Sequence, residues 1–318
     1  MDIFSRTRQK TRTPAASWRY ALATTTALLV LMTRAAAQAP SCETTDHRAI
    51  RFRSDPTHVS TYRLYGSHLC PTPVDRHRGA TPATHHPADR SSPKSRALPS
   101  GPPSRPPQTH GLLLYLHGDG AGEFDDPDDA TLTSFARIAR KHHMLMVAPR
   151  TPDTQTMTWW RKPGSTHYLR ALLLHLYAHY PIDRHHVWLV GYSGGAEEIT
   201  YNLLMDHNDL LHGGGALLVG GGGLSRTTVF GHIPSHPLRQ HFPLYWLAGE
   251  MDTPDRGGDD KGFDALGEAH VAERRLHAAG FLTHFRIIPD TGHYHIILHA
   301  PSMMDRLLTQ PAGSNNLD

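Results

Sequence analysis

The sequence predicts an α/β domain with a mostly parallel central sheet and helices on both faces. Three observations predict this class. From Gly111 onward, short apolar runs alternate with amphipathic segments, which is the order of strand–helix units. The runs are continuously apolar, as expected for strands covered on both faces. Finally, a glycine-rich turn at 191–195 joins one apolar run directly to a helical segment.

The strands follow from the apolar runs. Two short segments, Ala49–Arg53 and Thr61–Tyr65, are expected to form an antiparallel hairpin at the edge of the sheet. Pro149 ends one of the later runs, since proline cannot donate to a strand ladder. The six remaining predicted strands are Leu112–Leu116, Met144–Ala148, Val187–Val190, Ala216–Val219, Leu244–Ala248 and Thr283–Ile288.

The helices follow from apolar residues at helical spacing. One is expected around Leu132–Ala139, after an acidic stretch that suits a helix N-terminus. Pro181 follows the second helix and Gly280 follows the fourth. The four later helices are Tyr168–Tyr180, Ala196–Met205, Phe263–Ala279 and one that begins near Ile296.

Composition and charge narrow the class of protein. With 38% hydrophobic residues, 25 prolines and two cysteines among 318 residues, a polytopic membrane protein and a disulfide scaffold are both excluded. The net charge of +3 is uneven: residues 1–40 carry +5, 41–70 carry +1, 71–110 carry +4 and 111–318 carry −7. The predicted folded body is therefore acidic, which argues against a nucleic-acid partner.

The N-terminus has the order of a secretory signal peptide, predicted over residues 1–37. A basic run precedes the apolar stretch Tyr20–Met32, which is too short to span a bilayer, and small residues follow it. Cleavage is expected after Ala37 rather than Ala39, because Pro40 would follow the second cut. An uncleaved N-terminal anchor is the alternative. We therefore expect a secreted protein with no stable membrane insertion after cleavage.

The rest of the chain divides by composition. Residues 41–70 are assigned to the edge strands and 111–310 to the core of the α/β domain, with a flexible tail at 311–318. Between them, residues 71–110 hold ten of the 25 prolines without periodicity, which predicts a disordered insertion. Its positive charge could contact a cell wall or another polyanion.

Cys42 and Cys70 are the only cysteines. In an exported chain they are expected to pair and to add about 3 kcal/mol by restricting the unfolded state. A lipid anchor on Cys42 is the weaker alternative.

The motif Gly191-Tyr192-Ser193-Gly194-Gly195 lies between a predicted strand and a predicted helix. G-x-S-x-G in this setting presents a serine on a tight turn, where small neighbours let the strand and helix backbones pass closely. Ser193 is therefore the candidate nucleophile.

An activated serine needs a base and a carboxylate that orients the base. Asp252 and His293 each follow a predicted strand, in the order serine, acid, histidine. Glu250 and Asp255 are the alternatives for the acid.

The oxyanion formed on acyl attack needs two backbone amides. Gly194 supplies one, and Asp119 in the turn after the first parallel strand is expected to supply the other. His117 in the same turn is interpreted as a packing residue.

Trp159 and Trp160 lie in a loop that could overhang the site. They are predicted either to line a substrate groove or to anchor the loop. Two groups could be read as metal sites: His293 with His295 and His299, and Asp252 with Asp255, Asp259 and Asp260. For both groups, side chains that bind no metal are the favoured interpretation. We predict no metal and no cofactor.

Together these segments resemble an α/β-hydrolase over residues 48–310, and among such proteins secreted esterases of the polyhydroxybutyrate-depolymerase and feruloyl-esterase type. The segments that carry the resemblance are LHGDG, YPIDRHHVWLVGYSGG, GEMD and DTGH. The resemblance implies that Ser193 is the nucleophile, Asp252 the orienting acid and His293 the general base. Two departures are HGDG, where those esterases often have a cysteine and a further glycine, and Gly194, where alanine is common.

The predicted function is a secreted serine carboxylesterase that acts on a small or polymeric ester through an acyl-enzyme. A serine peptidase on the same fold and a non-catalytic wall- or polymer-binding protein are the alternatives.

Overall fold

The computed structural model describes residues 49–66, 109–159, 163–224, 236–256, 258 and 262–310. Several predictions lie outside these residues and stay predictions. They are the signal peptide, both cysteines, nearly all of the 71–110 insertion, Trp160, Asp259 and Asp260 of the calcium hypothesis, and the tail at 311–318. Within the described part of the chain, no helix is long and apolar enough to cross a membrane.

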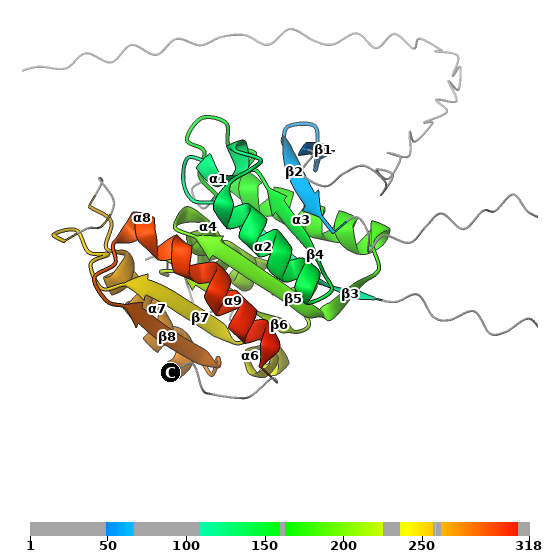
Figure 1. Cartoon of the computed structure of the whole chain (residues 1–318). Helices are drawn as coiled ribbons and strands as arrows, with labels where there is room; N and C mark the ends of the chain where they lie inside the picture. Colours follow the sequence, from blue (N-terminus) through cyan, green and yellow to red (C-terminus); the bar gives the residue numbers. More distant parts are fainter. Residues whose placement is uncertain are drawn as a thin grey trace, which may run out of the picture. The chain divides into compact units, whose positions relative to one another are not determined.

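An eight-stranded sheet forms the centre of the fold, with the strand order β1-β2-β4-β3-β5-β6-β7-β8 (Figure 1). β1 pairs antiparallel with β2 and β2 antiparallel with β4, while the other neighbours are parallel. The predicted fold class, including the N-terminal edge hairpin, is confirmed. The strands are β1 (Ala49–Arg53), β2 (Val59–Tyr65), β3 (His110–Leu116), β4 (Met144–Pro149), β5 (Ile182–Tyr192), β6 (Gly214–Val219), β7 (Leu244–Gly249) and β8 (Thr283–Ile288).

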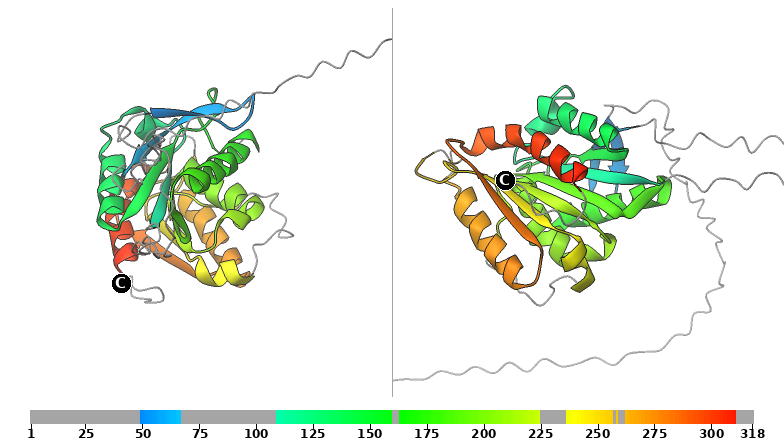
Figure 2. Two further views of the ribbon diagram at one scale, coloured as in Figure 1. Left: turned by 90° about the vertical axis from the view of Figure 1, so that its right-hand side faces the viewer. Right: turned by 60° about the horizontal axis from the view of Figure 1, so that its bottom comes forward.

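Helices cover both faces of the sheet (Figure 2). On one face lie α2 (Ala130–Lys141), α8 (His293–Ile296) and α9 (Ala300–Thr309). On the other lie α3 (Pro163–His179), α4 (Gly194–Glu198), the π-helical turn η2 (Ile199–Leu203), α5 (Leu204–Asp206), α6 (His236–His241) and α7 (Ala265–Ala278). Short elements complete the chain: α1 (Gly122–Asp125), η3 (Asn208–Leu210) and η5 (Ile297–His299).

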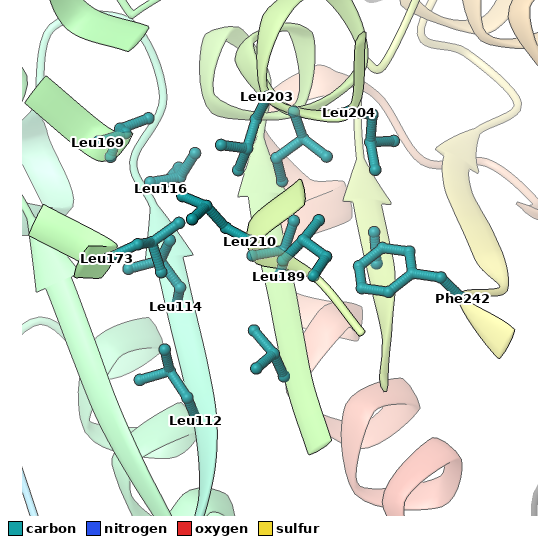
Figure 3. Packing of buried hydrophobic residues seen from close by; sticks show 14 of the residues in the cluster. Leu112, Leu114, Leu116, Leu169, Leu173, Leu189, Leu203, Leu204, Leu210 and Phe242 are labelled. Atoms are coloured by element: carbon teal, nitrogen blue, oxygen red, sulfur yellow. The ribbon is translucent and has the colours of Figure 1, made fainter. Parts of the chain in front are cut away.

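The core has two layers because successive strand residues point to opposite faces. On β3, Leu112, Leu114 and Leu116 pack toward α3 and the helices beside it, where Leu169 and Leu173 meet them (Figure 3). Leu113 and Tyr115 point the other way and pack with Phe135 of α2. Both layers are fully buried, as a continuously apolar strand predicts.

The helices differ most from prediction in α3, in the helix after Ser193 and in two short helices. α3 begins at Pro163, five residues before the expected Tyr168, because proline is tolerated in a first helical turn. The helix after Ser193 is interrupted by η2, and hydrophobic spacing does not reveal such a π-turn. The short α1 and α6 were not predicted, since neither has enough turns to show a periodic pattern.

Candidate active site

Ser193 lies on a strained turn between β5 and α4. Its φ of 49° and ψ of −117° place a non-glycine residue in a rarely populated region of the backbone map. The Ser193 amide donates to the Val219 carbonyl of β6 at 2.9 Å, which fixes the turn against the sheet. The serine is thus held at the carboxyl end of β5, where ligands bind in this class of sheet.

The glycines of the motif are explained by close backbone approaches. A Cβ on Gly191 would lie 2.6 Å from the Ala196 nitrogen, where the first turn of α4 passes the end of β5. A Cβ on Gly195 would collide with the Leu116 carbonyl oxygen at the end of β3. Any side chain at either position would push α4 away from the sheet and displace Ser193.

Ser193, His293 and Asp252 form one hydrogen-bonded chain. His293 Nε2 lies 3.0 Å from Ser193 Oγ, and His293 Nδ1 lies 3.0 Å from both carboxylate oxygens of Asp252. A carboxylate only accepts, so Nδ1 carries the proton and Nε2 is left to accept from the serine hydroxyl. The Asp252 and His293 side chains are buried, so little water competes for these bonds.

The two alternative acids lie elsewhere. Glu250 accepts the Asp290 amide at 3.2 Å, and Asp255 accepts the Thr253 hydroxyl at 2.8 Å. Asp252 is the residue that reaches the histidine because its amide bonds the Gly249 carbonyl and turns the chain inward at the end of β7.

Aromatic rings surround the imidazole of His293. Tyr192 stacks on it with ring centroids 5.6 Å apart, and its hydroxyl donates to the His293 carbonyl at 3.2 Å. Phe263 and Tyr294 contact it edge-on, at 5.8 and 5.5 Å. These contacts fix the ring plane, so that both ring nitrogens keep their partners.

The turn that follows β3, His117–Ala121, is the β3 turn. His117 is buried at its start: its Nδ1 donates to the Gly118 carbonyl at 2.6 Å, and its Nε2 accepts the Thr151 amide at 3.1 Å. Burial lowers the pKa of His117 to about 4, and the charge of Arg150 acts in the same direction, so the ring is neutral at pH 7. The side chain links the β3 turn to the loop after β4, which is the packing role predicted for it.

Glu123 also holds the β3 turn. Its Oε1 accepts the Gly118 amide at 3.3 Å and the Tyr115 hydroxyl at 3.2 Å. Burial raises the pKa of this carboxyl.

The two residues predicted to bind an oxyanion lie on neighbouring segments. Asp119 is exposed in the β3 turn, and Gly194 is the first residue of α4. The close approach of Gly195 to the end of β3 brings these segments side by side. The amides of Gly118, Gly120 and Ala121 donate to other protein oxygens.

The loop after β6, Gly220–Gly223, is the glycine loop, and it lies between the serine and the acid–base pair. A Cβ on Gly220 would lie 3.4 Å from Asp252 Oδ2 and 3.5 Å from His293 Nδ1. A Cβ on Gly221 would lie 2.9 Å from the Ser193 carbonyl oxygen. The loop therefore packs against all three members of the chain.

Glu197 holds the glycine loop. Its Oε1 accepts the amides of Gly222 and Gly223, each at 3.1 Å, from a buried position in α4. Burial raises the pKa of Glu197 to about 7; hydrogen bonds from Tyr201 and the glycine amides oppose the shift, and the charge of Glu268 adds to it.

Glu198, the next residue, is fully buried on a different side of α4. Its Oε2 accepts the Asn202 amide at 2.6 Å, and Thr166 of α3 also bonds it. Burial raises its pKa to about 8, so the carboxyl is mainly protonated at neutral pH. Neither glutamate is among the site residues predicted from the sequence. The available signal was a pair of acids inside the helix that follows a fully buried strand.

Trp159 is fully buried in the core against His117, with ring centroids 4.8 Å apart. Of the two roles predicted for Trp159, this position fits the loop anchor. A side chain with no exposed surface cannot line a substrate groove. Among the described residues, no group of three histidine, cysteine or acidic side chains is arranged to hold a metal.

No family model matches the chain, and no curated protein does. Solved structures do. A thermostable esterase matches with a TM-score of 0.54 and 16% identity over 83% of this chain, and the match spans 62% of that longer protein. A lidless α/β serine hydrolase from Xanthomonas campestris gives 0.46 and 14% over 84% of this chain and 93% of its own. A poly(3-hydroxybutyrate) depolymerase from Bordetella parapertussis gives 0.48 and 16% over 81% and 89%.

At sequence identities this low, the similarity to solved structures shows only the fold. The sheet order with its antiparallel edge, the strained serine turn after β5 and the match to the esterase agree on it. The protein has the α/β-hydrolase fold.

Proposed function

We propose that the protein is a secreted serine hydrolase that cleaves carboxylic esters through an acyl-enzyme. The observation that carries the proposal is the continuous chain from Ser193 Oγ through the His293 ring to Asp252. A strained serine backed by a buried imidazole and carboxylate is the arrangement that activates a hydroxyl for attack on a carbonyl carbon.

The chemistry follows from the positions of the donors and acceptors. Ser193 Oγ attacks the ester carbonyl while His293 Nε2 takes its proton, and Asp252 stabilises the imidazolium that forms. The amides of Gly194 and Asp119 are the proposed donors to the oxyanion. His293 then gives the proton to the departing alcohol. Water activated by the same ring hydrolyses the acyl-enzyme in the second half of the reaction.

An ester is the proposed substrate class because the sequence motifs resemble those of esterases, and the similar thermostable protein is itself named an esterase. Cleavage of peptides by the same residues is the second candidate, since the triad chemistry serves both bonds. A non-catalytic binding protein is the third, and it gives no reason for a strained serine that bonds a buried histidine.

Ser193→Ala tests the proposal. Activity on short-chain esters is expected to fall at least about 10³-fold, because the oxyanion donors alone retain only a small part of triad catalysis. The variant should also lose labelling by a fluorophosphonate while its circular dichroism is unchanged. Full ester turnover by the folded alanine variant would reject the assignment. Faster turnover of peptides than of esters by the wild type would favour the peptidase.

Export belongs to the proposal through the N-terminal segment. N-terminal sequencing of the protein from the medium is expected to begin at Gln38. A chain retained with residues 1–37 attached would instead support the uncleaved anchor. A small or polymeric ester is the proposed partner, and contact with a cell wall through the basic insertion is the further proposal for residues 71–110.

A further inference from the structure

Glu197 is not a member of the catalytic chain, yet it lies one helical turn beyond Ser193 and holds the glycine loop, which packs against all three members. Its carboxylate accepts two consecutive backbone amides of the glycine loop, at 3.1 Å each. The Glu197 amide donates to the Ser193 carbonyl at 3.1 Å, so the first turn of α4 joins the two backbones directly.

The glycine loop has little freedom to move without moving the site. Position 221 lies against the Ser193 carbonyl oxygen, and position 220 lies against Asp252 and His293. The loop is tied on its far side by Trp246, whose Nε1 donates to the Gly222 carbonyl at 2.9 Å. A displacement of the loop by a fraction of an ångström would therefore change the spacing between the serine and its base.

The titratable side chains that face Glu197 come from two other elements. Tyr201 of η2 donates toward it, and Glu268 of α7 is a second carboxyl near the same place. A Cβ on Gly223 would lie 3.0 Å from Glu268 Oε2 and 3.3 Å from Glu197 Oε2, so both carboxyls reach one glycine. Two acids this close favour keeping a proton between them.

We propose that Glu197 is a positioning residue of the esterase site, and that the protein is fully active only when this carboxyl is deprotonated. The proposal rests on the proposed function. Hydrogen bonds to an ionised acceptor are shorter and roughly twice as strong as those to a neutral one, so loss of the charge loosens both amide contacts at once. The glycine loop then relaxes, and the spacing of Ser193 to His293 relaxes with it.

The pH dependence of kcat/KM is the sharpest test. His293 must be neutral to accept the serine proton, and Glu197 must be ionised to hold the loop. Two protons must therefore leave, and log kcat/KM of the wild type should rise on the acid side with a slope that approaches 2. Burial places the pKa of Glu197 at about 7, within the range where the assay is practical.

Glu197→Gln keeps an amide oxygen that can accept from both glycines and removes the titration. Its slope should fall to 1, and its kcat at neutral pH should fall about tenfold below that of the wild type, because the neutral amide oxygen accepts as weakly as the protonated acid. Glu197→Ala removes the acceptor and should lower kcat about 10- to 100-fold with KM nearly unchanged. The matched control is Glu198→Gln, which alters the neighbouring buried glutamate without touching the loop and should keep the slope of 2.

A second measurement is independent of any substrate. In protein labelled with ¹⁵N-glycine, the Gly222 and Gly223 amide resonances should titrate with a shared midpoint in the wild type and in Glu198→Gln, but not in Glu197→Gln. A wild-type slope of 1, or glycine amides that do not titrate, would overturn the proposal even if Glu197→Gln failed to fold. Titrating glycines in a protein that hydrolyses no ester would instead reject the proposed function and leave the role of Glu197 in the loop intact.

Discussion

The β3 turn and the glycine loop flank Ser193, and His117 and Glu197, which help to hold them, respond to pH in opposite directions. Each is an irregular segment at the carboxyl end of a parallel strand, and each needs its backbone amides satisfied. The β3 turn is held by His117, a buried ring that stays neutral at pH 7, and by Glu123, which accepts the Gly118 amide. The glycine loop is tied by Glu197, a buried acid that titrates near neutrality.

The opposite pKa shifts of His117 and Glu197 predict opposite effects of pH on the stability of the fold. The unfolded chain protonates histidine near its ordinary pKa of 6.5, whereas folded His117 resists protonation down to about pH 4. Stability from this residue is therefore lost as pH falls through that window. Folded Glu197 keeps its proton to about pH 7, whereas the unfolded chain releases it near 4.5, so stability is lost as pH rises through that window.

Ionisation of Glu197, which holds the glycine loop, therefore lowers the stability of the folded protein. If Glu197 must be ionised for full activity, the protein is most active in the pH range where this residue stabilises it least. A trade of stability for function is expected at catalytic sites. The β3 turn shows no such conflict at His117, because the neutral ring is both the stable form and the form that accepts the Thr151 amide.

The largest expected effect comes from filling the glycine loop. Gly221→Ala places a Cβ 2.9 Å from the Ser193 carbonyl, so either the serine or the loop must shift. Ester turnover should fall about 100-fold, the size of loss that follows a 1 Å misplacement. The matched change beside the β3 turn is Gly122→Ala, which meets nothing within 4 Å and should leave turnover unchanged. Equal losses of ester turnover in Gly221→Ala and Gly122→Ala would show that the glycine loop is no more sensitive than the segment beside the β3 turn.

The next effect is on the pH dependence of stability. His117→Gln keeps an oxygen that can accept the Thr151 amide, and it should reduce the loss of stability between pH 6.5 and 5. Glu197→Gln should instead reduce the loss between pH 5 and 7. Each change is expected to be on the order of 1–3 kcal/mol, seen as a shift of several degrees in Tm.

Thermal unfolding of both variants and the wild type across pH 5–8 measures these shifts. The Glu123 carboxyl, with its raised pKa, acts on the β3 turn in the same direction as Glu197, so the test is the change caused by each substitution rather than the total. Two variants that change the pH dependence of Tm in the same direction would show that the opposition in sign is wrong.

The smallest effect concerns the indole that ties the glycine loop. Trp246→Phe removes the hydrogen bond to the Gly222 carbonyl, while Trp159→Phe removes an indole nitrogen that has no partner among the described residues. Both changes leave a similar void in the core. Trp246→Phe should therefore be the more destabilising by about 1 kcal/mol, the net worth of one hydrogen bond. Chemical denaturation of the two variants gives the difference directly, and a larger loss in Trp159→Phe would contradict it.

The fold class and the members of the serine chain could be predicted because they depend on local pattern and chain order. Apolar runs reveal buried strands, and residues that follow parallel strands meet at one edge of the sheet. Ser193, Asp252 and His293 each follow such a strand, so their meeting needed no knowledge of packing. The choice of Asp252 over Glu250 and Asp255 was open, because one turn offers several carboxyls and only its folded path points one inward.

The sequence by itself determined the alternation of strands and helices, the serine turn and the order of the serine, the acid and the histidine. Only the tertiary structure decided that Glu197 and Glu198 are buried, that Trp159 lies in the core, and that the glycine loop packs against Ser193, Asp252 and His293. The physical reason is that periodicity is a property of neighbours in the chain. The burial of a single charged or aromatic side chain depends on which distant segments close over it.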